Sequence, residues 1–385
     1  MRKQTKIAAV VSAAALLALG ASMTSFAASK GTWMMVDGEW YCYDKNGDAY
    51  TNVFCSSNGK EYYVGEDGAI VTSSWVDYAE GIYYVNSSGA KITSDWRFTT
   101  PYEDEDADEE WYYFGSNGKR SENKKIVYKG NTYYFDQDGK MLTGWVTYEN
   151  ASGSEQSVDE ANGFIDGSTY YCDETGARVT SDWVKTVAPE DIDNNDADEE
   201  WYYFKSNGKR AEGEKITYKG KTYYFDTDGK MLTGWVTTTS DKKENVNEAT
   251  DFEDGHTFYC DETGARVEGA WIKDTAPGVS DDAADEDEYW YYLKKATGKP
   301  ATGKQSNING QIYLFNKYGQ MQYGWVAEAT DSDVKFLRLD EDDNEIAMEE
   351  ATGKVYYCGD EDDGHAKKNK WTKTWLPDNT SEEDD

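Results

Sequence analysis

Side chains that could act in catalysis or hold a metal are few in this 385-residue chain. His256 and His365 are its only histidines, and neither has a Cys or His at metal-ligand spacing, so the sequence predicts no zinc site and no His-based catalytic triad. Asp and Glu are so frequent that a carboxylate pair for glycoside hydrolysis can be drawn anywhere, which gives such a pair no weight. We therefore expect no catalytic residue, no metal site and no cofactor.

The five cysteines form an odd set, so they cannot all pair into disulfides. Cys172, Cys260 and Cys358 occupy equivalent positions after a pair of aromatic residues. We expect them to be small buried apolar side chains that do not touch one another. Cys42 and Cys55 are predicted on opposite strands of one hairpin, and whether they pair stays open.

Aromatic rings, rather than aliphatic side chains, supply the apolar surface that would drive folding. The chain holds 14 Trp, 31 Tyr and 12 Phe, and its formal net charge is −35 with a pI near 4.3. One large aliphatic core is therefore not expected. An acidic chain repels phosphodiester backbones and anionic lipid headgroups, which argues against nucleic acid or a bare membrane as partner and favours a cationic or neutral ligand.

The two ends of the chain differ from the rest. Residues 1–27 have the pattern of a secretory signal peptide, in which three basic residues precede an apolar run over 7–19 and small residues lead to Ala27. The run is too short to span a bilayer, and no membrane insertion is expected. Residues 376–385 read as an acidic, frayed tail.

Internal repeats organise the remainder of the chain. The string DADEEWYYF occurs at 106–114 and at 196–204, and KMLTGWVT begins at Lys140 and again at Lys230. A fixed period of this kind indicates a repeat architecture. The acidic insertions that open with Pro101, Pro189 and Pro277 are predicted to be solvated loops.

A shorter unit lies inside the long period: an aromatic pair, a Gly five residues later and then a Trp, as in Tyr133-Tyr134, Gly139 and Trp145. Alternating rings predict a strand, the Asp-Gly or Asn-Gly predicts a tight turn, and the chain then returns to the Trp, so each unit is predicted to be a β-hairpin. The turn glycines of these units are Gly47, Gly68, Gly89, Gly118, Gly139, Gly176, Gly208, Gly229, Gly264, Gly298, Gly319 and Gly364.

A lone hairpin is only marginally stable in water, so the hairpins must bury their rings against one another. We predict an all-β fold, a solenoid of about twelve stacked β-hairpins with acidic loop insertions. The solenoid covers residues 28–375 and is divided into four triplets of hairpins, at about 33–96, 97–183, 184–271 and 272–375.

The segment from Tyr128 to Trp145, YKGNTYYFDQDGKMLTGW, closely resembles the cell-wall-binding repeats of exported Gram-positive proteins. This family includes the choline-binding repeats and the related glucan-binding and clostridial-toxin repeats, and the resemblance extends from about Trp33 to Trp371. It implies a hairpin solenoid whose successive members frame shallow ligand sites. In choline-binding members, the Trp that closes one hairpin, the aromatic residue that opens the next and a further Tyr enclose a trimethylammonium group, which ring faces attract through cation–π interactions.

Applied to this chain, the resemblance implies ligand sites where the third hairpin of one triplet meets the first hairpin of the next, because only there do two Trp meet. The implied ligand-binding residues are Trp96, Trp111 and Tyr134, then Trp183, Trp201 and Tyr224, then Trp271, Trp290 and Tyr313, with Tyr133 and Tyr223 as alternatives to their neighbours. Acidic loops separate the two Trp of each pair. These loops either add carboxylates that favour a cation or fold over the groove and block it.

Sequence and resemblance together predict a non-catalytic protein that is secreted and held non-covalently at the cell surface. Its expected partner is a cell-wall polymer, either a choline-bearing teichoic acid or another wall polysaccharide. Two alternatives stay open. One is an α-glucan-binding repeat protein, and the other is a structural or adhesin-like surface spacer whose rings only stack.

Overall fold

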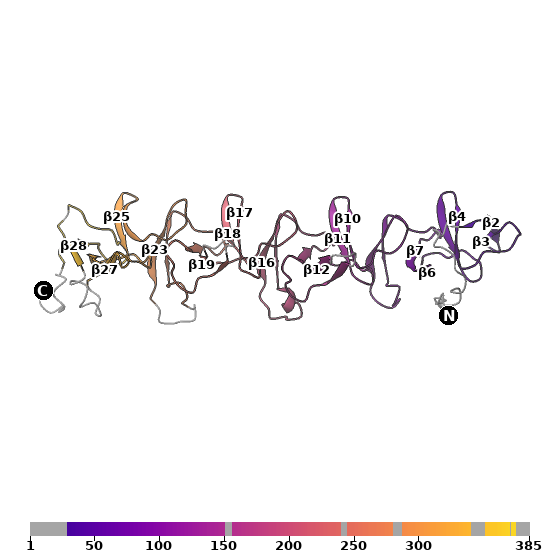
Figure 1. Ribbon diagram of the computed structural model, residues 1–385, viewed down its shortest axis with the longest axis horizontal. Helices are drawn as coiled ribbons and strands as arrows, with labels where there is room; N and C mark the ends of the chain where they lie inside the picture. The colour runs from indigo at the N-terminus through magenta and orange to yellow at the C-terminus, as the bar shows by residue number, and fades with distance from the viewer. Residues whose placement is uncertain are drawn as a thin grey trace. The chain divides into compact units, whose positions relative to one another are not determined.

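The computed structural model describes residues 29–150, 156–239, 245–279, 287–339, 351–369 and 371–374, which fold almost entirely as β-strands joined by turns (Figure 1). These residues form no α-helix and one short 3₁₀ helix, η1, at Pro189–Asp191. Across the same ranges, no helix is long and apolar enough to cross a membrane. The predicted signal peptide and the predicted acidic tail lie outside the described residues.

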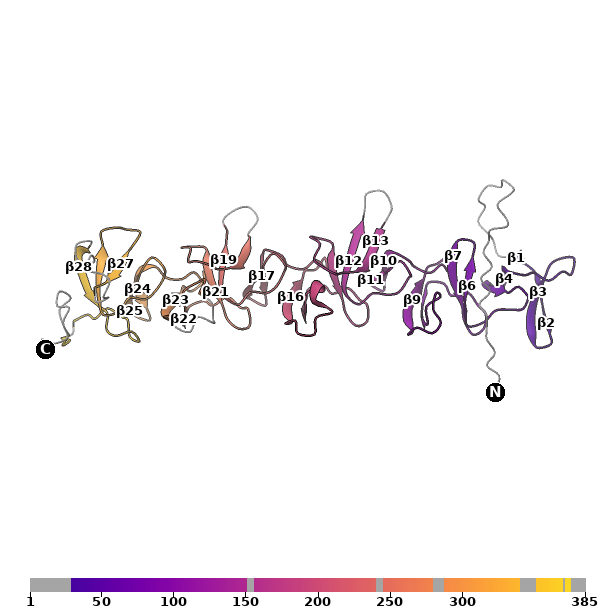
Figure 2. The same cartoon turned by 90° about the horizontal axis from the view of Figure 1, so that it is seen from below.

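The chain divides into two compact units, Met1–Val179 and Thr180–Asp385. Within each unit the hairpins follow one another in chain order, as two perpendicular views show (Figure 1, Figure 2). The strands of the first unit are β1 (Ser29–Lys30), β2 (Thr32–Val36), β3 (Glu39–Tyr43), β4 (Val53–Ser57), β5 (Lys60–Val64), β6 (Ser74–Tyr78), β7 (Gly81–Val85), β8 (Asp95–Thr99), β9 (Glu110–Phe114), β10 (Lys124–Tyr128), β11 (Asn131–Phe135), β12 (Gly144–Asn150), β13 (Gln156–Glu160) and β14 (Thr169–Cys172).

The second unit is likewise built of hairpins and three-stranded sheets. Its strands are β15 (Asp182–Thr186), β16 (Glu200–Phe204), β17 (Lys215–Tyr218), β18 (Lys221–Tyr224), β19 (Gly234–Thr238), β20 (Val246–Glu248), β21 (Thr257–Cys260), β22 (Ala270–Asp274), β23 (Tyr289–Leu293), β24 (Gly303–Ile308), β25 (Gln311–Phe315), β26 (Trp325–Ala329), β27 (Phe336–Arg338) and β28 (Ala351–Tyr357).

Most sheets are two-stranded antiparallel hairpins, such as β8–β9 and β15–β16. In three places a third strand joins, giving the orders β13-β12-β14, β20-β19-β21 and β27-β26-β28, and near the start β1 pairs in parallel with β4. The described residues form twelve sheets in all. The predicted all-β chain of about twelve hairpins is therefore confirmed, whereas its division into four triplets stays a prediction.

The hairpin boundaries differ from the predicted ones by one strand. The aromatic strand β11 pairs backwards with β10, across the turn Lys129-Gly130, and not forwards across the turn at Gly139. Both Lys129 (φ 49°) and Gly130 (φ 90°) have positive φ, which is the backbone of the type I′ turn that fits the twist of paired strands. A hairpin therefore consists of a strand that usually contains Trp followed by the next aromatic strand.

The predicted turn glycines mark the links between hairpins. In one such link the Asp136 carboxylate accepts hydrogen bonds from the backbone N–H groups of Asp138 and Lys140, at 2.9 and 2.8 Å. Gly139 follows with φ at 75°, and one isolated bridge joins Phe135 to Met141 before the chain leaves for the next strand. The predicted turn is thus present, but only one residue pair is bridged across it, and no ladder of paired strands follows.

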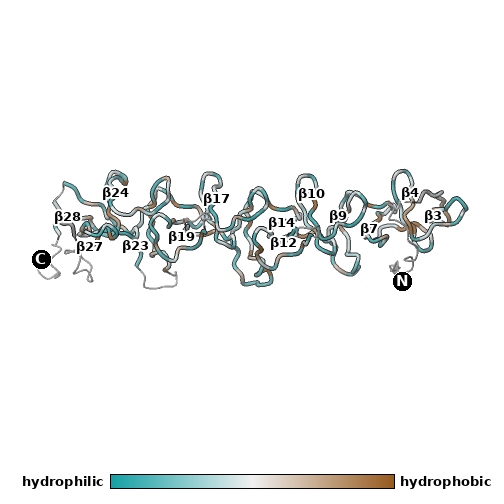
Figure 3. Tube along the Cα trace, viewed as in Figure 1, coloured by the Kyte–Doolittle hydropathy of each residue, from teal (hydrophilic) through white to brown (hydrophobic). Residues whose placement is uncertain are grey.

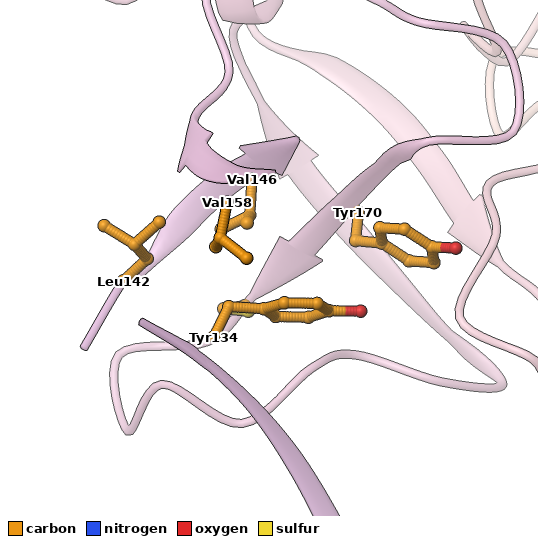
Figure 4. Close-up of a cluster of buried hydrophobic side chains, with 6 residues drawn as sticks. Tyr134, Leu142, Val146, Val158 and Tyr170 are labelled. Carbon is orange, nitrogen blue, oxygen red and sulfur yellow. The ribbon is translucent and has the colours of Figure 1, made fainter. Parts of the chain in front are cut away.

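The core is a series of aromatic clusters between successive hairpins. One of them gathers Tyr134, Tyr170, Val146, Val158 and Leu142, all less than a tenth exposed (Figure 4). The hairpin tips, by contrast, are hydrophilic, as at the turns after β10 and β17 (Figure 3). Because side chains alternate along a strand, each aromatic strand places one face in the cluster before it and the other face in the cluster after it.

Candidate ligand-binding junctions

The three predicted Trp pairs are formed, each across one antiparallel hairpin. Trp96 lies on β8 opposite Tyr113, and Trp111 lies on β9 opposite Phe98, which places the two indoles on the same face of the hairpin. Their ring centroids are 6.4 Å apart at an interplanar angle of 82°. The other two pairs repeat this geometry, Trp183 with Trp201 at 6.4 Å and 83°, and Trp271 with Trp290 at 6.5 Å and 83°.

A tyrosine from the following hairpin completes each group. Tyr133 has its ring centroid 4.9 Å from that of Trp96. Tyr223 is 4.9 Å from Trp183, and Tyr313 is 4.8 Å from Trp271. Two of the residues predicted for this role, Tyr134 and Tyr224, lie elsewhere, and the alternatives Tyr133 and Tyr223 occupy their place.

Strand alternation explains the correction. Tyr134 points to the other face of β11, where it is fully buried and its ring stacks 5.7 Å from Tyr170. Its hydroxyl oxygen accepts a hydrogen bond from the Arg178 guanidinium at 3.2 Å. Tyr224 is placed in the same way, with its ring 5.4 Å from Phe258. Both tyrosines therefore belong to the next cluster along the chain.

A methionine that the sequence analysis did not single out lies beside each Trp pair. It stands two residues after a turn glycine, which we call the post-glycine position, and its backbone N–H donates to the carbonyl of the second Trp. These bonds are Met141 to Trp111 at 2.9 Å, Met231 to Trp201 at 2.8 Å and Met321 to Trp290 at 2.8 Å. Met321 is buried among Trp271, Trp290 and Tyr313. The duplicated string KMLTGWVT already contained this signal.

The group of two Trp, one Tyr and one Met is called a junction and is named after its first Trp. The Trp96 junction is Trp96, Trp111, Tyr133 and Met141, the Trp183 junction is Trp183, Trp201, Tyr223 and Met231, and the Trp271 junction is Trp271, Trp290, Tyr313 and Met321. Trp111 and Trp201 are 44% and 42% exposed. Part of each of these indoles is thus open to solvent, while the Tyr and, in the Trp271 junction, the Met321 side chain pack against the Trp pair.

A fourth Trp pair escaped the sequence analysis. Trp33 on β2 and Trp40 on β3 occupy the strand positions that Trp96 and Trp111 occupy in their hairpin. Tyr62 from the next hairpin lies 5.6 Å from Trp33, and the post-glycine residue Ile70 donates its N–H to the Trp40 carbonyl at 2.9 Å. The sequence placed Trp pairs at three hairpin contacts, and the shifted hairpin boundary puts Trp33 and Trp40 at the corresponding strand positions of a fourth hairpin.

The acidic insertions pack on a different tryptophan from those of the pairs. The Trp75 indole N–H donates to the carbonyl of Thr100 at 2.9 Å, and Tyr102 lies edge-on to Trp75 at 6.3 Å. In the second unit, the Trp235 indole N–H donates to the carbonyl of Thr275 at 3.0 Å. The chain around Pro101 therefore packs against Trp75, whereas Trp111 is 44% exposed.

Electrostatics near the first two junctions favour a cation. Asp95 and Asp182 are exposed and precede Trp96 and Trp183. Each carboxylate accepts a hydrogen bond from the backbone N–H of the Trp that follows it, at 2.9 Å. Burial, followed by the nearby Tyr128 and Asp95, raises the pKa of the Tyr113 hydroxyl, so this ring stays neutral at physiological pH. A carboxylate next to the first Trp of the pair along the chain adds a longer-range charge attraction to the attraction of ring faces for a positive charge.

The cysteines lie outside the three junctions, and no metal-binding cluster of the described residues lies in them. All five Cys are free and buried, and Cys55 and Cys42 share a hydrogen bond between their side chains. Burial raises the pKa of Cys260 and of Cys358 to about 12, which leaves almost no reactive thiolate at neutral pH. Within the described ranges, no group of three or more His, Cys, Asp or Glu side chains is arranged to hold a metal ion.

A cavity of about 290 Å³ lies in the second unit beside the Trp271 junction, whose Met321 forms part of its wall. Three tyrosines, three side-chain amides and two cations contribute to its wall, and no carboxylate does. The Arg338 guanidinium is stacked 3.9 Å from the centre of the Tyr323 ring. Its polar and aromatic lining includes Tyr289, Tyr318, Tyr323, Gln320, Lys317 and Arg338.

Comparison with known proteins places these features in context. Residues 195–234 match the family profile described as choline-binding repeat, and residues 106–119 and 124–141 match that described as putative cell wall binding repeat. Glucosyltransferase-S of Streptococcus mutans is 27% identical over 291 residues, which cover 76% of this chain and 16% of that protein. Glucosyltransferase-I of Streptococcus downei is 28% identical over 374 residues, covering 87% and 21%.

The chain thus spans 16% and 21% of the length of these two curated relatives. Among solved structures, choline binding protein F of Streptococcus pneumoniae is 20% identical, with 89% of this chain and 100% of that chain covered and a TM-score of 0.41. The profiles match the segments that contain Trp111, Tyr133, Met141 and Trp201. The segments at 106–119, 124–141 and 195–234 are therefore repeats of the choline-binding, or cell-wall-binding, type.

Proposed function

We propose that this protein is non-catalytic, is exported, and attaches non-covalently to cell-wall polymers through its Trp-pair junctions. The observation that carries the proposal is the repeated geometry of the Trp96, Trp183 and Trp271 junctions, whose Trp–Trp and Trp–Tyr distances agree within 0.1 Å of one another. Rings that only fill a core need not keep their second indole more than 40% exposed, as Trp111 and Trp201 do.

The favoured ligand is a quaternary ammonium group, such as the choline of a substituted teichoic acid. Such a group has no hydrogen-bond donor, so ring faces and a polarizable thioether are suitable contacts, each ring being worth about 0.5–2 kcal/mol. Exposed carboxylates at Asp95 and Asp182 support a cation further. The matched repeat profiles support a wall polymer as the carrier of this group.

The test replaces the second Trp of each junction by Leu, as Trp111→Leu, Trp201→Leu and Trp290→Leu, singly and together. Each replacement is expected to weaken retention on choline-bearing cell wall. The free energy of unfolding is expected to fall by about 1 kcal/mol or less for Trp111→Leu and Trp201→Leu, because these rings are more than 40% exposed, and by somewhat more for the less exposed Trp290. Retention on purified wall and the thermal midpoint are measured on the same samples.

Trp371→Leu is the matched control, because Trp371 is fully exposed and lies outside the junctions. It is expected to change neither quantity. Retention and stability that fall in parallel across the three junction variants would favour a structural spacer whose rings only stack. Hydrolysis of purified wall by the wild-type chain would contradict the non-catalytic part of the proposal.

A second candidate function, binding of a neutral α-glucan, is favoured by the cavity of the second unit. Tyrosine faces next to side-chain amides suit a sugar ring and its hydroxyl groups, and Tyr318, Tyr323 and Gln322 line this cavity. If this function holds, soluble glucan releases the protein from its polymer when choline does not, and Tyr323→Ala weakens that binding while Trp111→Leu leaves it unchanged.

A further inference from the structure

The ring groups of the first unit fall into two classes, according to whether a cation of the chain lies among the rings. The name junction is extended here to the ring groups that contain such a cation. The Phe54 junction (Phe54, Tyr63, Tyr83 and Lys91) and the Trp75 junction (Trp75, Tyr84, Tyr112 and Arg120) have the same strand positions and backbone bridges as the Trp96 junction. Trp75 lies 4.9 Å from Tyr112 and 5.2 Å from Tyr84, against 4.9 and 5.1 Å for the equivalent contacts of Trp96. The two Trp–Tyr contacts are therefore nearly identical, while the second indole of the Trp96 junction, Trp111, is replaced by Ile82.

The contents of these ring groups are not identical. In the Trp75 junction the guanidinium carbon of Arg120 lies 5.6 Å from the centre of the Trp75 ring and 6.0 Å from that of Tyr112. In the Phe54 junction the ammonium of Lys91 lies 5.0 Å from Phe54 and 5.3 Å from Tyr83. All four cation-to-ring distances are within the range of cation–π attraction. Each of these two ring groups therefore already contains a positive charge from the chain itself.

Carboxylates hold these cations in place. Glu103 from the acidic insertion forms a two-point ion pair with Arg120 at 2.9 and 3.3 Å, and Glu122 bonds its Nε at 2.9 Å. Lys91 is paired with Glu61. The Arg120 side chain is only 4% exposed. Burial acts to lower the Arg120 pKa, but the bonds to Glu103 and Glu122 outweigh it, and the pKa is raised, so Arg120 stays charged.

Two positions distinguish the two classes of junction, and they are joined by a backbone hydrogen bond. One is the second residue of the aromatic strand, here called the opening position, and the other is the post-glycine position, whose N–H donates to the opening carbonyl. An opening Trp is bonded to an uncharged residue in the pairs Trp40–Ile70, Trp111–Met141, Trp201–Met231 and Trp290–Met321. Another opening residue is bonded to a cation in the pairs Glu61–Lys91, Ile82–Arg120, Thr132–Arg178 and Thr222–Arg266. The pair Ile312–Ala366 departs from this pattern, since neither residue is a Trp or a cation.

We propose that the post-glycine residue determines whether a junction binds an external cation. Lys91 and Arg120 act as built-in cations that fill the Phe54 and Trp75 junctions, and the acidic insertion keeps Arg120 there through Glu103. Met141 leaves the Trp96 junction free for a ligand. The proposal deepens the proposed function and rests on it, because it states which ring groups of this chain can take a quaternary ammonium group and which cannot.

The experiment titrates tetramethylammonium into full-length protein and follows the indole N–H signals of Trp75 and Trp96 by NMR. In the wild type the Trp96 signal is expected to shift and the Trp75 signal to stay. In Arg120→Met, and more strongly in Ile82→Trp combined with Arg120→Met, the Trp75 signal is expected to shift as well. Arg120→Lys keeps a cation in the junction and is the matched control, in which Trp75 is expected to stay silent.

Met141→Lys makes the reverse change and does not depend on the folding of the Arg120 variants. It is expected to weaken tetramethylammonium binding at Trp96 by on the order of tenfold or more, the loss of one desolvated ring contact, while the Trp183 and Trp271 signals still respond. Met141→Leu is the control and is expected to bind as the wild type does.

Two outcomes would overturn the proposal. One is a Trp75 signal that shifts in the wild type, and the other is unchanged binding at Trp96 in Met141→Lys. Failure of the proposed function looks different, because Trp96, Trp183 and Trp271 would then all stay silent in the wild type. A Trp75 signal that responds only in Arg120→Met would in that case still support the role of Arg120.

Discussion

Neighbouring side chains on one strand serve different clusters in this protein, so a shift of a single residue changes the role that is assigned to a ring. Tyr133 faces Trp96, whereas Tyr134 is buried against Tyr170. The sequence shows the Tyr-Tyr pair and predicts alternation, but it does not show which face of β11 meets the preceding hairpin. The Trp residues could be predicted individually because each is the closing or opening residue of a repeat, while the choice between adjacent Tyr required the strand register.

A partly buried carboxylate in the turns gives a test at the residue scale. Burial is the main reason that the pKa of Asp136 is raised, and its bonds to the backbone N–H groups of Lys140 and Asp138 only partly oppose this. Since the folded-state pKa exceeds the unfolded value, the native state binds more protons, and stability is lost as the pH rises through the folded pKa.

Asp136→Asn keeps the oxygen that accepts the two N–H groups and removes the ionisation. At pH 7 the variant is expected to be at least as stable as the wild type, and the wild type is expected to gain on it as the pH falls. Asp136→Ala loses both hydrogen bonds and should cost about 1–3 kcal/mol at either pH. Urea unfolding at several pH values measures this, with Asp138→Asn as a control for charge alone. Equal losses in Asp136→Asn and Asp136→Ala at pH 7 would contradict the explanation.

Hairpins were predicted in the right number but with the wrong boundaries, and the reason lies in the turns. Each repeat has two glycine turns, one at Lys129-Gly130 and one at Gly139, and both need positive φ. The Asp-Gly sequence favoured the second turn as the hairpin. In the structure, Asp136 accepts two backbone hydrogen bonds within this turn, and only one bridge forms beyond it before the chain continues to the next strand. Sequence patterns identify a turn but not how long the ladder beyond it runs.

Two of these glycines form a matched pair for a test at the element scale. Both have positive φ, so Ala at either position should cost about 1–2 kcal/mol of backbone strain. A Cβ at Gly130 would meet no atom within 4 Å, whereas a Cβ at Gly139 would come within 2.7 Å of the Arg120 side chain. Arg120 is nearly buried and paired with Glu103 and Glu122, so it has little freedom to move away.

Gly139→Ala is therefore expected to lower the free energy of unfolding by about 1–3 kcal/mol more than Gly130→Ala does, because crowding is added to strain. Urea denaturation followed by tryptophan fluorescence compares the two variants. In Gly139→Ala combined with Arg120→Ala the clash is removed, so the excess cost should disappear. An equal cost for the two single variants would show that Arg120 is not held in the Trp75 junction.

At the scale of the whole molecule, composition and repeat period predicted the fold class, since an acidic chain rich in Trp and Tyr can bury rings only by stacking hairpins. The division into two compact units at Val179 and Thr180 was not predicted. The long period of the sequence continues across this point without a linker, and nothing in the composition marks it. The acidic insertions were predicted as solvated loops, but Glu103 and Thr100 show that their first residues are bound to the Trp75 junction.

Several weak junctions on one chain should act together on a polymer. A single ring cage holds a quaternary ammonium group weakly, whereas several cages that bind one polymer raise the joint affinity by roughly 10² to 10⁴ over one site. We expect the protein to stay on choline-bearing wall at about 1 M salt and to elute when free choline is added, because salt screens charge–charge attraction over about 3 Å but leaves ring contacts largely intact. The high salt is needed because a chain of net charge −35 binds any cationic matrix by ion exchange.

The measurement is elution from purified wall with salt alone, then with salt and choline, and finally with soluble glucan. The triple variant Trp111→Leu, Trp201→Leu and Trp290→Leu should leave in the salt wash, while each single variant should need less choline than the wild type. Release of the wild type by salt alone would exclude choline as the ligand, and retention that yields only to glucan would select the α-glucan alternative.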